Sequence, residues 1–115
     1  MIQKTFVEIG GGLVARITFS LPEAIWADQI TLVGDFNQWN TQSHALARNG
    51  SGVWRITVDL EPRRAYQFRY LADGIDWLND RDADAHVHNI YGSSNSVVVT
   101  DPEFKRYTDE RKTQQ

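Results

Sequence analysis

The chain has 115 residues, a formal net charge of -3 and no cysteine. Its length fits one domain, its charge provides no basic surface for nucleic acid or anionic lipid, and the lack of cysteine excludes disulfides, cysteine nucleophiles and thiolate metal sites. No segment approaches the ~20 apolar residues that span a membrane, and the first residues lack the apolar core of a secretory signal, so we expect a cytoplasmic location.

Short segments that alternate apolar and polar residues follow one another along the chain, separated by glycine, proline and aspartate. This alternation is typical of β-strands that bury one face. About seven short strands are predicted, and the clearest of them are residues 5–9, 13–21, 29–33, 52–60, 66–72 and 95–100. Residues 40–50 are polar and predict a loop.

Strands of this length, separated by turns and without a convincing helix, are typical of two-layer β proteins. We therefore predict an all-β fold for residues 1–100, an immunoglobulin-like antiparallel β-sandwich; a small β-barrel is the alternative. Residues 101–115 are a polar C-terminal tail, either irregular or a frayed helix, and we expect its end to be mobile.

The four tryptophans occupy different positions in this pattern. Trp54 belongs to a regularly alternating strand, which predicts a core position, whereas Trp26 precedes a strand and is predicted to be a half-buried cover. Trp39 and Trp77 are flanked by Asp, Asn and Gly, which form exposed turns. A large aromatic residue on such a loop either binds a ligand or packs the turn, and the local pattern favours neither.

A sugar ligand would suit two loop tryptophans. A pyranose ring has an apolar face of C–H groups, and an indole buries that face effectively. Arg69, in the strand that leads to Trp77, carries a planar guanidinium that can donate to sugar hydroxyls, although an arginine there is more often a solvated sheet residue. Asn95 begins the last predicted strand, and its amide can both donate and accept.

An ordered series of motifs resembles a known family. In chain order these are residues 30–40 (ITLVGDFNQWN), 66–74 (YQFRYLADG), 77–84 (WLNDRDAD) and 89–99 (NIYGSSNSVVV). Together they resemble the starch- and glycogen-binding domains of carbohydrate-binding module family 48. This family includes early-set N-terminal domains of isoamylase and glycogen branching enzymes, and the glycogen-binding domain of the AMP-activated protein kinase β subunit. The resemblance covers about residues 12–100 and is specific as a series, although each motif alone is weak.

The resemblance implies a set of carbohydrate-binding residues. In glycogen-binding members, two tryptophans stack on glucose rings, and these positions fall on Trp39 and Trp77. A basic strand residue and an asparagine near the last strand hydrogen-bond sugar hydroxyls, and these positions fall on Arg69 and Asn95. Such a module is noncatalytic, needs no cofactor and has an α-glucan polysaccharide or oligosaccharide as its partner.

Two further positions, and three departures, come from the same resemblance. Tyr91 stands where a large apolar residue contacts the ring of a cyclic glucan, and Ser93 stands at a small hydroxyl position nearby. Arg69 occupies a position that is more often lysine, and the segment 73–77 is one residue longer than in the kinase domain. Arg81 replaces the usual proline, which makes the following loop less rigid.

Alternating acids and two histidines make a metal site the main competing interpretation of residues 80–88. Asp80, Asp82 and Asp84 are spaced as in a calcium loop, but the glycine and closing glutamate of the EF-hand are absent. His86 and His88 lack further ligands at zinc spacing. We therefore interpret the acids as solvated carboxylates of turns and predict no metal site.

These observations predict a noncatalytic module that binds α-glucan, that is glycogen, starch or maltooligosaccharide. The alternative is a protein-interaction or regulatory module of immunoglobulin-like build. A third possibility combines the two, since the chain could be an accessory that brings a separately encoded glycogen-metabolising enzyme or kinase to its polymer.

Overall fold

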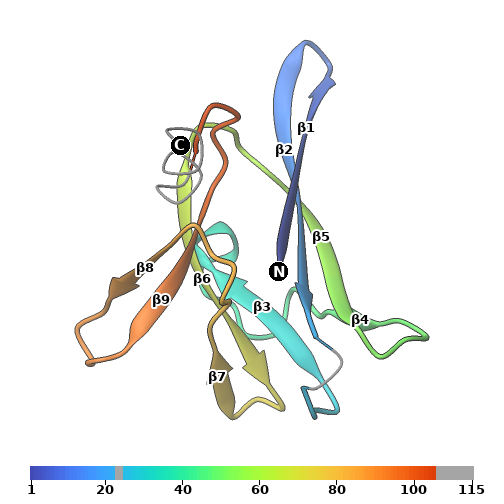
Figure 1. Cartoon of the computed structure of the whole chain (residues 1–115), viewed down its shortest axis with the longest axis vertical. Coiled ribbons are helices and arrows are strands. Elements are labelled where there is room, and N and C mark those ends of the chain that lie inside the picture. Colours follow the sequence, from blue (N-terminus) through green and yellow to red (C-terminus); the bar gives the residue numbers. More distant parts are fainter. Residues whose placement is uncertain (23–24, 106–115) are drawn as a thin grey trace, which may run out of the picture.

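The computed structural model describes residues 1–22 and 25–105. In that part the chain forms nine β-strands and one turn of 3-10 helix, and no helix there is long and apolar enough to cross a membrane (Figure 1). The elements are β1 (Ile2–Ile9), β2 (Gly12–Leu21), β3 (Ile30–Gly34), η1 (Asp35–Asn37), β4 (Ala47–Arg48), β5 (Trp54–Leu60), β6 (Ala65–Ala72), β7 (Asp76–Leu78), β8 (Ala85–His88) and β9 (Ser94–Val99).

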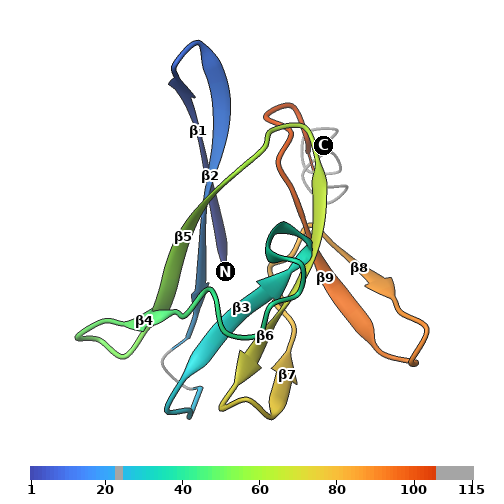
Figure 2. The ribbon, with the colours of Figure 1, turned by 180° about the vertical axis from the view of Figure 1, so that it is seen from behind.

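The strands form two antiparallel sheets that lie as separate layers (Figures 1 and 2). One sheet has the order β1-β2-β5-β4, and the other has the order β3-β6-β9-β8 with β7 paired to β6. Two layers of antiparallel strands with connections between sheets are the arrangement of a β-sandwich. The prediction of an immunoglobulin-like antiparallel β-sandwich is confirmed.

The sequence missed three of the shortest strands. β4 has two residues and lies in the stretch predicted as a loop. β7 and β8 have three and four residues, lie beside polar turns and show no clear alternation of burial. Their stability comes from pairing with longer strands, because β7 pairs with β6 and β8 pairs with β9. Trp77 therefore lies on a strand at a sheet edge and not in a loop.

Strand β6 is the centre of the second sheet. Along one edge, the C-terminal half of β6 pairs with β3. Along the other edge, β9 pairs with residues up to Phe68, and β7 pairs with residues from Tyr70 onward. Because β7 and β9 diverge between these two residues, Arg69 lies at the fork. Side chains alternate across a strand, so Arg69 points to the face opposite Phe68 and Tyr70.

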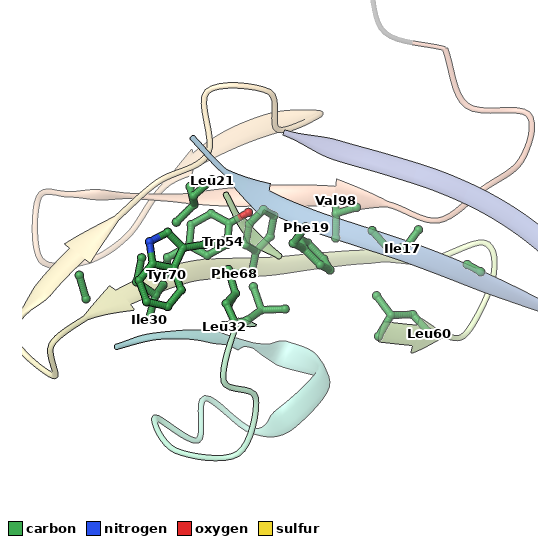
Figure 3. Packing of buried hydrophobic residues seen from close by; sticks show 13 residues of the cluster. Ile17, Phe19, Leu21, Ile30, Leu32, Trp54, Leu60, Phe68, Tyr70 and Val98 are labelled. Atoms are coloured by element: carbon green, nitrogen blue, oxygen red, sulfur yellow. The ribbon is translucent and has the colours of Figure 1, made fainter. Parts of the chain in front are cut away.

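The core lies between the two sheets and is rich in aromatic rings (Figure 3). Phe68 of β6 contacts Phe19 of β2 edge to face, with ring centres 5.1 Å apart, and Tyr70 continues the cluster at 5.7 Å from Phe68.

Trp54 is 5% exposed, which confirms its predicted core position. Trp26 is 94% exposed, so the prediction of a half-buried cover is wrong. Its strand-flanking position indicated burial, but the segment before β3 leaves the indole outside the core.

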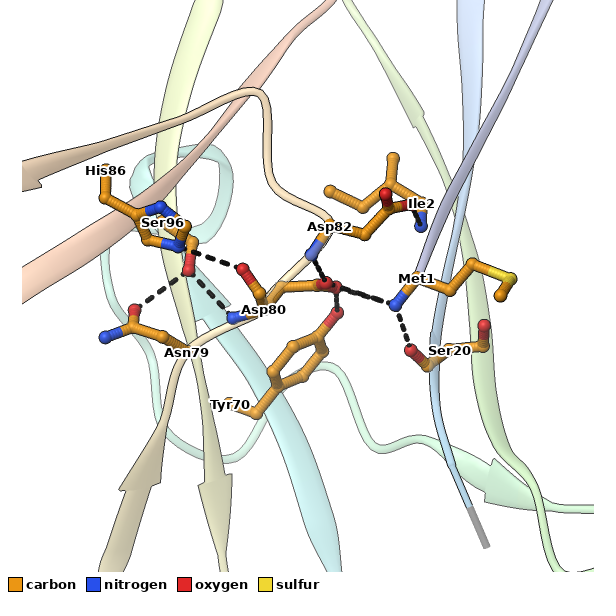
Figure 4. A network of polar contacts seen from close by, with 9 residues as sticks. All are labelled: Met1, Ile2, Ser20, Tyr70, Asn79, Asp80, Asp82, His86 and Ser96. Atoms are coloured by element: carbon orange, nitrogen blue, oxygen red, sulfur yellow. Dashed lines mark hydrogen bonds and ion pairs between the residues drawn. The ribbon is translucent and has the colours of Figure 1, made fainter. Parts of the chain in front are cut away.

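A buried carboxylate joins the two sheets at one side of the core (Figure 4). Asp80 is 2% exposed, and its Oδ2 accepts a hydrogen bond from the Tyr70 hydroxyl at 2.6 Å. The backbone N–H of Asp82 donates to Oδ1, and the amino group of Met1 lies 3.1 Å from both oxygens. The interpretation of these acids as solvated is wrong for Asp80, because burial of a carboxylate is tolerated only with several donors.

The same network fixes the chain that follows β7. His86 Nε2 donates to the carbonyl oxygen of Asp80, and the Ser96 hydroxyl accepts from the Asp80 N–H and donates to Asn79 Oδ1 (Figure 4). Asp84 is also engaged, since its Oδ2 accepts from Lys4 Nζ at 2.7 Å and from the Val99 N–H. Segment 79–84 is therefore held against β9 and β1, and β7 is anchored at its C-terminal end.

The Tyr70–Asp80 pair should make stability depend on alkaline pH. Burial, and after it the negative charge of Asp80, raises the pKa of Tyr70 well above its ordinary value. The unfolded chain releases this proton near pH 10 while the folded chain keeps it, so the free energy of unfolding should fall above about pH 10 by about 1.4 kcal/mol per pH unit. Urea unfolding of the wild-type and Tyr70→Phe proteins between pH 8 and about pH 11 measures this. Equal pH slopes in the two proteins would contradict the assignment.

The predicted C-terminal tail falls largely outside the described residues, which end at residue 105. The part that the structure describes, residues 101–105, leaves β9 as a turn. There Phe104 packs against the first sheet, with Lys4 Nζ 5.1 Å from the centre of its ring.

Candidate functional site

The turn after β3 places Trp39. Gly34 ends β3 so close to β6 that a Cβ atom on it would lie 2.6 Å from the carbonyl oxygen of Gln67. Only glycine fits such an approach. The buried Asn37 side chain then accepts from the Gly34 N–H and donates to the carbonyl oxygen of Leu32, which closes η1 over the end of the strand. This accounts for the run Gly-Asp-Phe-Asn that precedes Trp39.

Trp39 has an unusual backbone conformation. Gln38 and Trp39 have φ angles of 53° and 57°, in the left-handed region that non-glycine residues rarely occupy. The Trp39 N–H donates to the carbonyl oxygen of Gly34 at 2.9 Å, which holds the conformation. Strained backbone that neighbouring contacts enforce is a feature of functional sites. Here the residue held in this conformation carries a half-buried indole.

One carboxylate ties the Trp39 indole to β6. Asp35 Oδ1 accepts from Trp39 Nε1 at 2.9 Å, and Asp35 Oδ2 accepts from the Gln67 N–H at 2.7 Å. The indole nitrogen is therefore satisfied within the protein, and the orientation of the ring is fixed before any ligand arrives. A fixed ring loses little conformational freedom on binding.

Arg69 and Trp77 meet on the outer face of the second sheet. Trp77 pairs with Leu71, two residues along β6 from Arg69, and its indole is 42% exposed. The Arg69 guanidinium carbon lies 5.6 Å from the centre of the Trp77 ring, which is a cation–π contact. Arg69 Nη1 is 3.5 Å from the Ser93 hydroxyl, and its Nε is buried with no partner among the described residues.

The β8–β9 hairpin carries the other three predicted residues, and Asn89 organises them. Asn89 Oδ1 accepts from the N–H groups of Tyr91 and Ser93, and its Nδ2 donates to the Ser93 hydroxyl at 2.8 Å. The same Nδ2 lies 3.5 Å from Asn95 Oδ1. Asn95 Nδ2 in turn donates to Gln67 Oε1 at 3.0 Å. Tyr91 is 87% exposed at the hairpin tip.

These contacts join five of the six predicted residues in one connected row. In order along it stand Trp39, Asp35, Gln67, Asn95, Asn89, Ser93, Arg69 and Trp77. We refer to these eight residues as the outer row. The link between Asp35 and Gln67 uses the Gln67 N–H, whereas the other links join side chains. Tyr91 stands beside the row, because its N–H bonds Asn89 while its side chain is exposed at the hairpin tip. The outer row combines indole faces with amide, hydroxyl and guanidinium groups, which are the groups that recognise a neutral polyhydroxylated ligand.

Sequence reasoning missed Asp35, Gln67 and Asn89 as members of the row. A signal for Gln67 was present, because it lies two residues before Arg69 in an alternating strand and must share its face. Asn89 precedes Ile-Tyr-Gly, and asparagine in such a tip often bonds the backbone two residues on. Asp35 had no such signal, since a turn aspartate does not indicate which indole it will bind.

The acids and histidines of residues 80–88 do not gather into a metal site in the part of the chain that the structure describes. Asp80, Asp84 and His86 are instead engaged in the hydrogen bonds of the network in Figure 4 and its neighbours.

The family follows from a comparison of sequences. Residues 24–102 match the model of carbohydrate-binding module 48, the isoamylase N-terminal domain. This chain belongs to carbohydrate-binding module family 48. The family is one of noncatalytic binding modules, and its model spans η1, β6, β7 and the β8–β9 hairpin, which together supply the outer row.

Curated relatives of this family 48 chain are far larger proteins. It is 28% identical over 85 residues to the 1,4-alpha-glucan branching enzyme GlgB of Mesorhizobium japonicum. This matched segment is 69% of the chain and 12% of that enzyme. It is 50% identical over 32 residues to the 1,4-alpha-glucan-branching enzyme of Aspergillus oryzae. That matched segment is 28% of the chain and 5% of the enzyme. The chain thus spans a small fraction of the length of these enzymes.

Proposed function

We propose that this chain is a noncatalytic module that binds α-glucan on the outer face of its second sheet, through the outer row. The observation that carries the proposal is the connected row itself, in which hydrogen bonds along β6, β9 and the turn after β3, together with the Arg69–Trp77 contact, link two indoles. The proposal draws its ligand from the names of the relatives, which act on 1,4-alpha-glucan. Glycogen, starch and maltooligosaccharides share that linkage and are the expected ligands.

In this proposal the two indoles supply stacking surface and the polar groups set the orientation of the sugar. Trp39 offers a ring whose nitrogen is already bonded to Asp35, and Trp77 offers a ring supported from one side by Arg69. The Arg69 guanidinium and the Asn95 amide then reach sugar hydroxyls at the edges of the stacked rings. Because the face is open and buries few rings, we expect modest affinity.

The carboxylate of the row supports a binding role without catalysis. Hydrolysis of a glycosidic bond uses two carboxyl groups that flank the bond, one of them as an acid. Asp35 is the carboxylate of the outer row, and each of its oxygens accepts a hydrogen bond from the protein. It is committed to holding Trp39 in place, so we assign it a positioning role.

Titration with maltoheptaose tests the proposal. Stacking changes the surroundings of Trp39 and Trp77, so the tryptophan emission should change in a saturable way at sub-millimolar to millimolar sugar. A β-linked glucan oligomer of equal length is the matched control, because its extended shape places successive rings differently. No change with maltoheptaose in a folded protein would overturn glucan binding. It would leave a protein-interaction module, for which the exposed Ile90 and Tyr91 at the hairpin tip are the available apolar surface.

A further inference from the structure

A groove of about 400 Å³ is lined by Trp77 and by residues that do not belong to the outer row. Its floor is a line of paired residues across the sheet, in which Thr31 of β3 pairs with Leu71 of β6 and Leu71 pairs with Trp77 of β7. Thr41 and Gln42, from the segment that follows Trp39, line the groove as well. The groove is therefore bounded by the segments that carry the two candidate stacking residues, and its volume falls in the range of small-ligand sites.

The floor of the groove contains a hydroxyl that lacks a partner. Thr31 is 2% exposed, and its Oγ1 is buried without a hydrogen bond to any residue that the structure describes. Buried hydroxyls are nearly always hydrogen-bonded, so an unpaired one in the floor of a groove marks a place where an ordered water or a polar ligand group supplies the missing bond. In the conformation described, Oγ1 lies beneath the groove surface, so a ligand reaches it only after the Thr31 side chain turns to another staggered χ1 well.

The other lining groups define the chemistry of that ligand. Gln29 and Gln42 contribute amides, Thr41 contributes a hydroxyl, and Asp73 is the charged group of the lining. Asp73 Oδ1 accepts from the N–H groups of Asp28 and Gln29, which fixes this end of the groove. The lining has no cation, so it does not suit a phosphate or another anion. It suits a neutral ligand with several hydroxyls and one apolar face against Trp77.

We propose that the groove holds one further glucosyl unit of the same α-glucan chain, adjacent to the unit stacked on Trp77. Its hydroxyls bond Thr31 Oγ1 and the amide of Gln42, and its ring passes along Leu71. This inference rests on the proposed function, since it lengthens the same binding face. The module then contacts the polymer through the groove as well as through the outer row.

The test uses Thr31→Val and Gln42→Ala with maltoheptaose, followed by calorimetry and by the NMR signals of the glutamine side-chain amides. Thr31→Val keeps the shape of the side chain and removes a hydroxyl that has no partner, so the fold should be at least as stable as the wild type. The affinity of each variant should fall about three- to tenfold, the effect of one lost hydrogen bond. The Gln42 and Gln29 amide signals of the wild type should shift on binding.

Thr57→Val is the matched control, because Thr57 lies on the other sheet, where its hydroxyl bonds that of Thr18. It should bind maltoheptaose as the wild type does. If the wild type binds but Thr31→Val and Gln42→Ala keep full affinity, the groove proposal is overturned and the outer row stands. If the wild type does not bind maltoheptaose at all, the proposed function and the groove proposal both fall.

Discussion

Replacement of Trp77 by alanine should lower the affinity for maltoheptaose by about thirtyfold. Truncation of a tryptophan at the centre of a binding surface typically costs about 2 kcal/mol, which corresponds to that factor. Trp77 meets the conditions for such an effect, since its indole is 42% exposed and is supported by the Arg69 guanidinium at 5.6 Å. Its loss removes the stacking surface and leaves Arg69 without its aromatic neighbour.

Trp39→Ala should have an effect of similar size, and the double variant should show no measurable binding. Isothermal titration calorimetry is the suitable measurement, because the variants lose the fluorescent reporter together with the contact. Urea unfolding of each variant shows whether the fold is kept, and it should be, because neither indole belongs to the buried core.

Trp26→Ala is the matched control for both variants. Trp26 is 94% exposed, and no described hydrogen bond or ring contact joins it to the outer row. Its removal should leave the affinity for maltoheptaose unchanged. A large loss in Trp26→Ala, together with full binding by Trp39→Ala and Trp77→Ala, would place the glucan elsewhere on the molecule.

The fold could be predicted from the sequence where a strand has its own pattern. Residues 15–21 of β2, all of β5 and residues 66–70 of β6 alternate apolar and polar residues, so their faces follow from the spacing alone. β7 has three residues, and its identity as a strand depends on β6 alongside it. Local pattern cannot reveal a strand whose stability comes from pairing with another strand, so the sequence predicts a loop at Trp77.

The candidate site likewise contains residues that the sequence predicts and residues that become visible only in the structure. Trp39, Trp77, Arg69 and Asn95 were chosen from motifs, yet the contacts that connect them come from Asp35, Gln67 and Asn89 in three separate elements. Each of these three acts through a hydrogen bond to a residue far away or across a tight turn, which sequence spacing does not specify. The burial of Asp80 was missed for a similar reason, since its polar neighbours in the sequence resemble a solvated turn while its partner Tyr70 lies on another strand.

Replacement of Asp80 by alanine should lower the free energy of unfolding by about 3 kcal/mol, which is the scale expected when one partner of a buried polar network is removed. Three donors lose their acceptor: the Tyr70 hydroxyl, the Asp82 N–H and the Met1 amino group (Figure 4). The Tyr70 hydroxyl is the costly one, because Tyr70 is fully buried and its hydroxyl loses a 2.6 Å bond to a charged acceptor. Urea unfolding at pH 7 measures the loss.

A double-mutant cycle separates the hydroxyl–carboxylate bond from the rest of the network. Tyr70→Phe and Asp80→Ala each break the 2.6 Å bond, so the double variant should lose less stability than the two single variants combined. Glu8→Ala is the control, since Glu8 is an exposed carboxylate on β1 and its loss should change stability by less than about 0.5 kcal/mol. Strict additivity of the two single losses would show that Tyr70 and Asp80 do not stabilise the sandwich through each other.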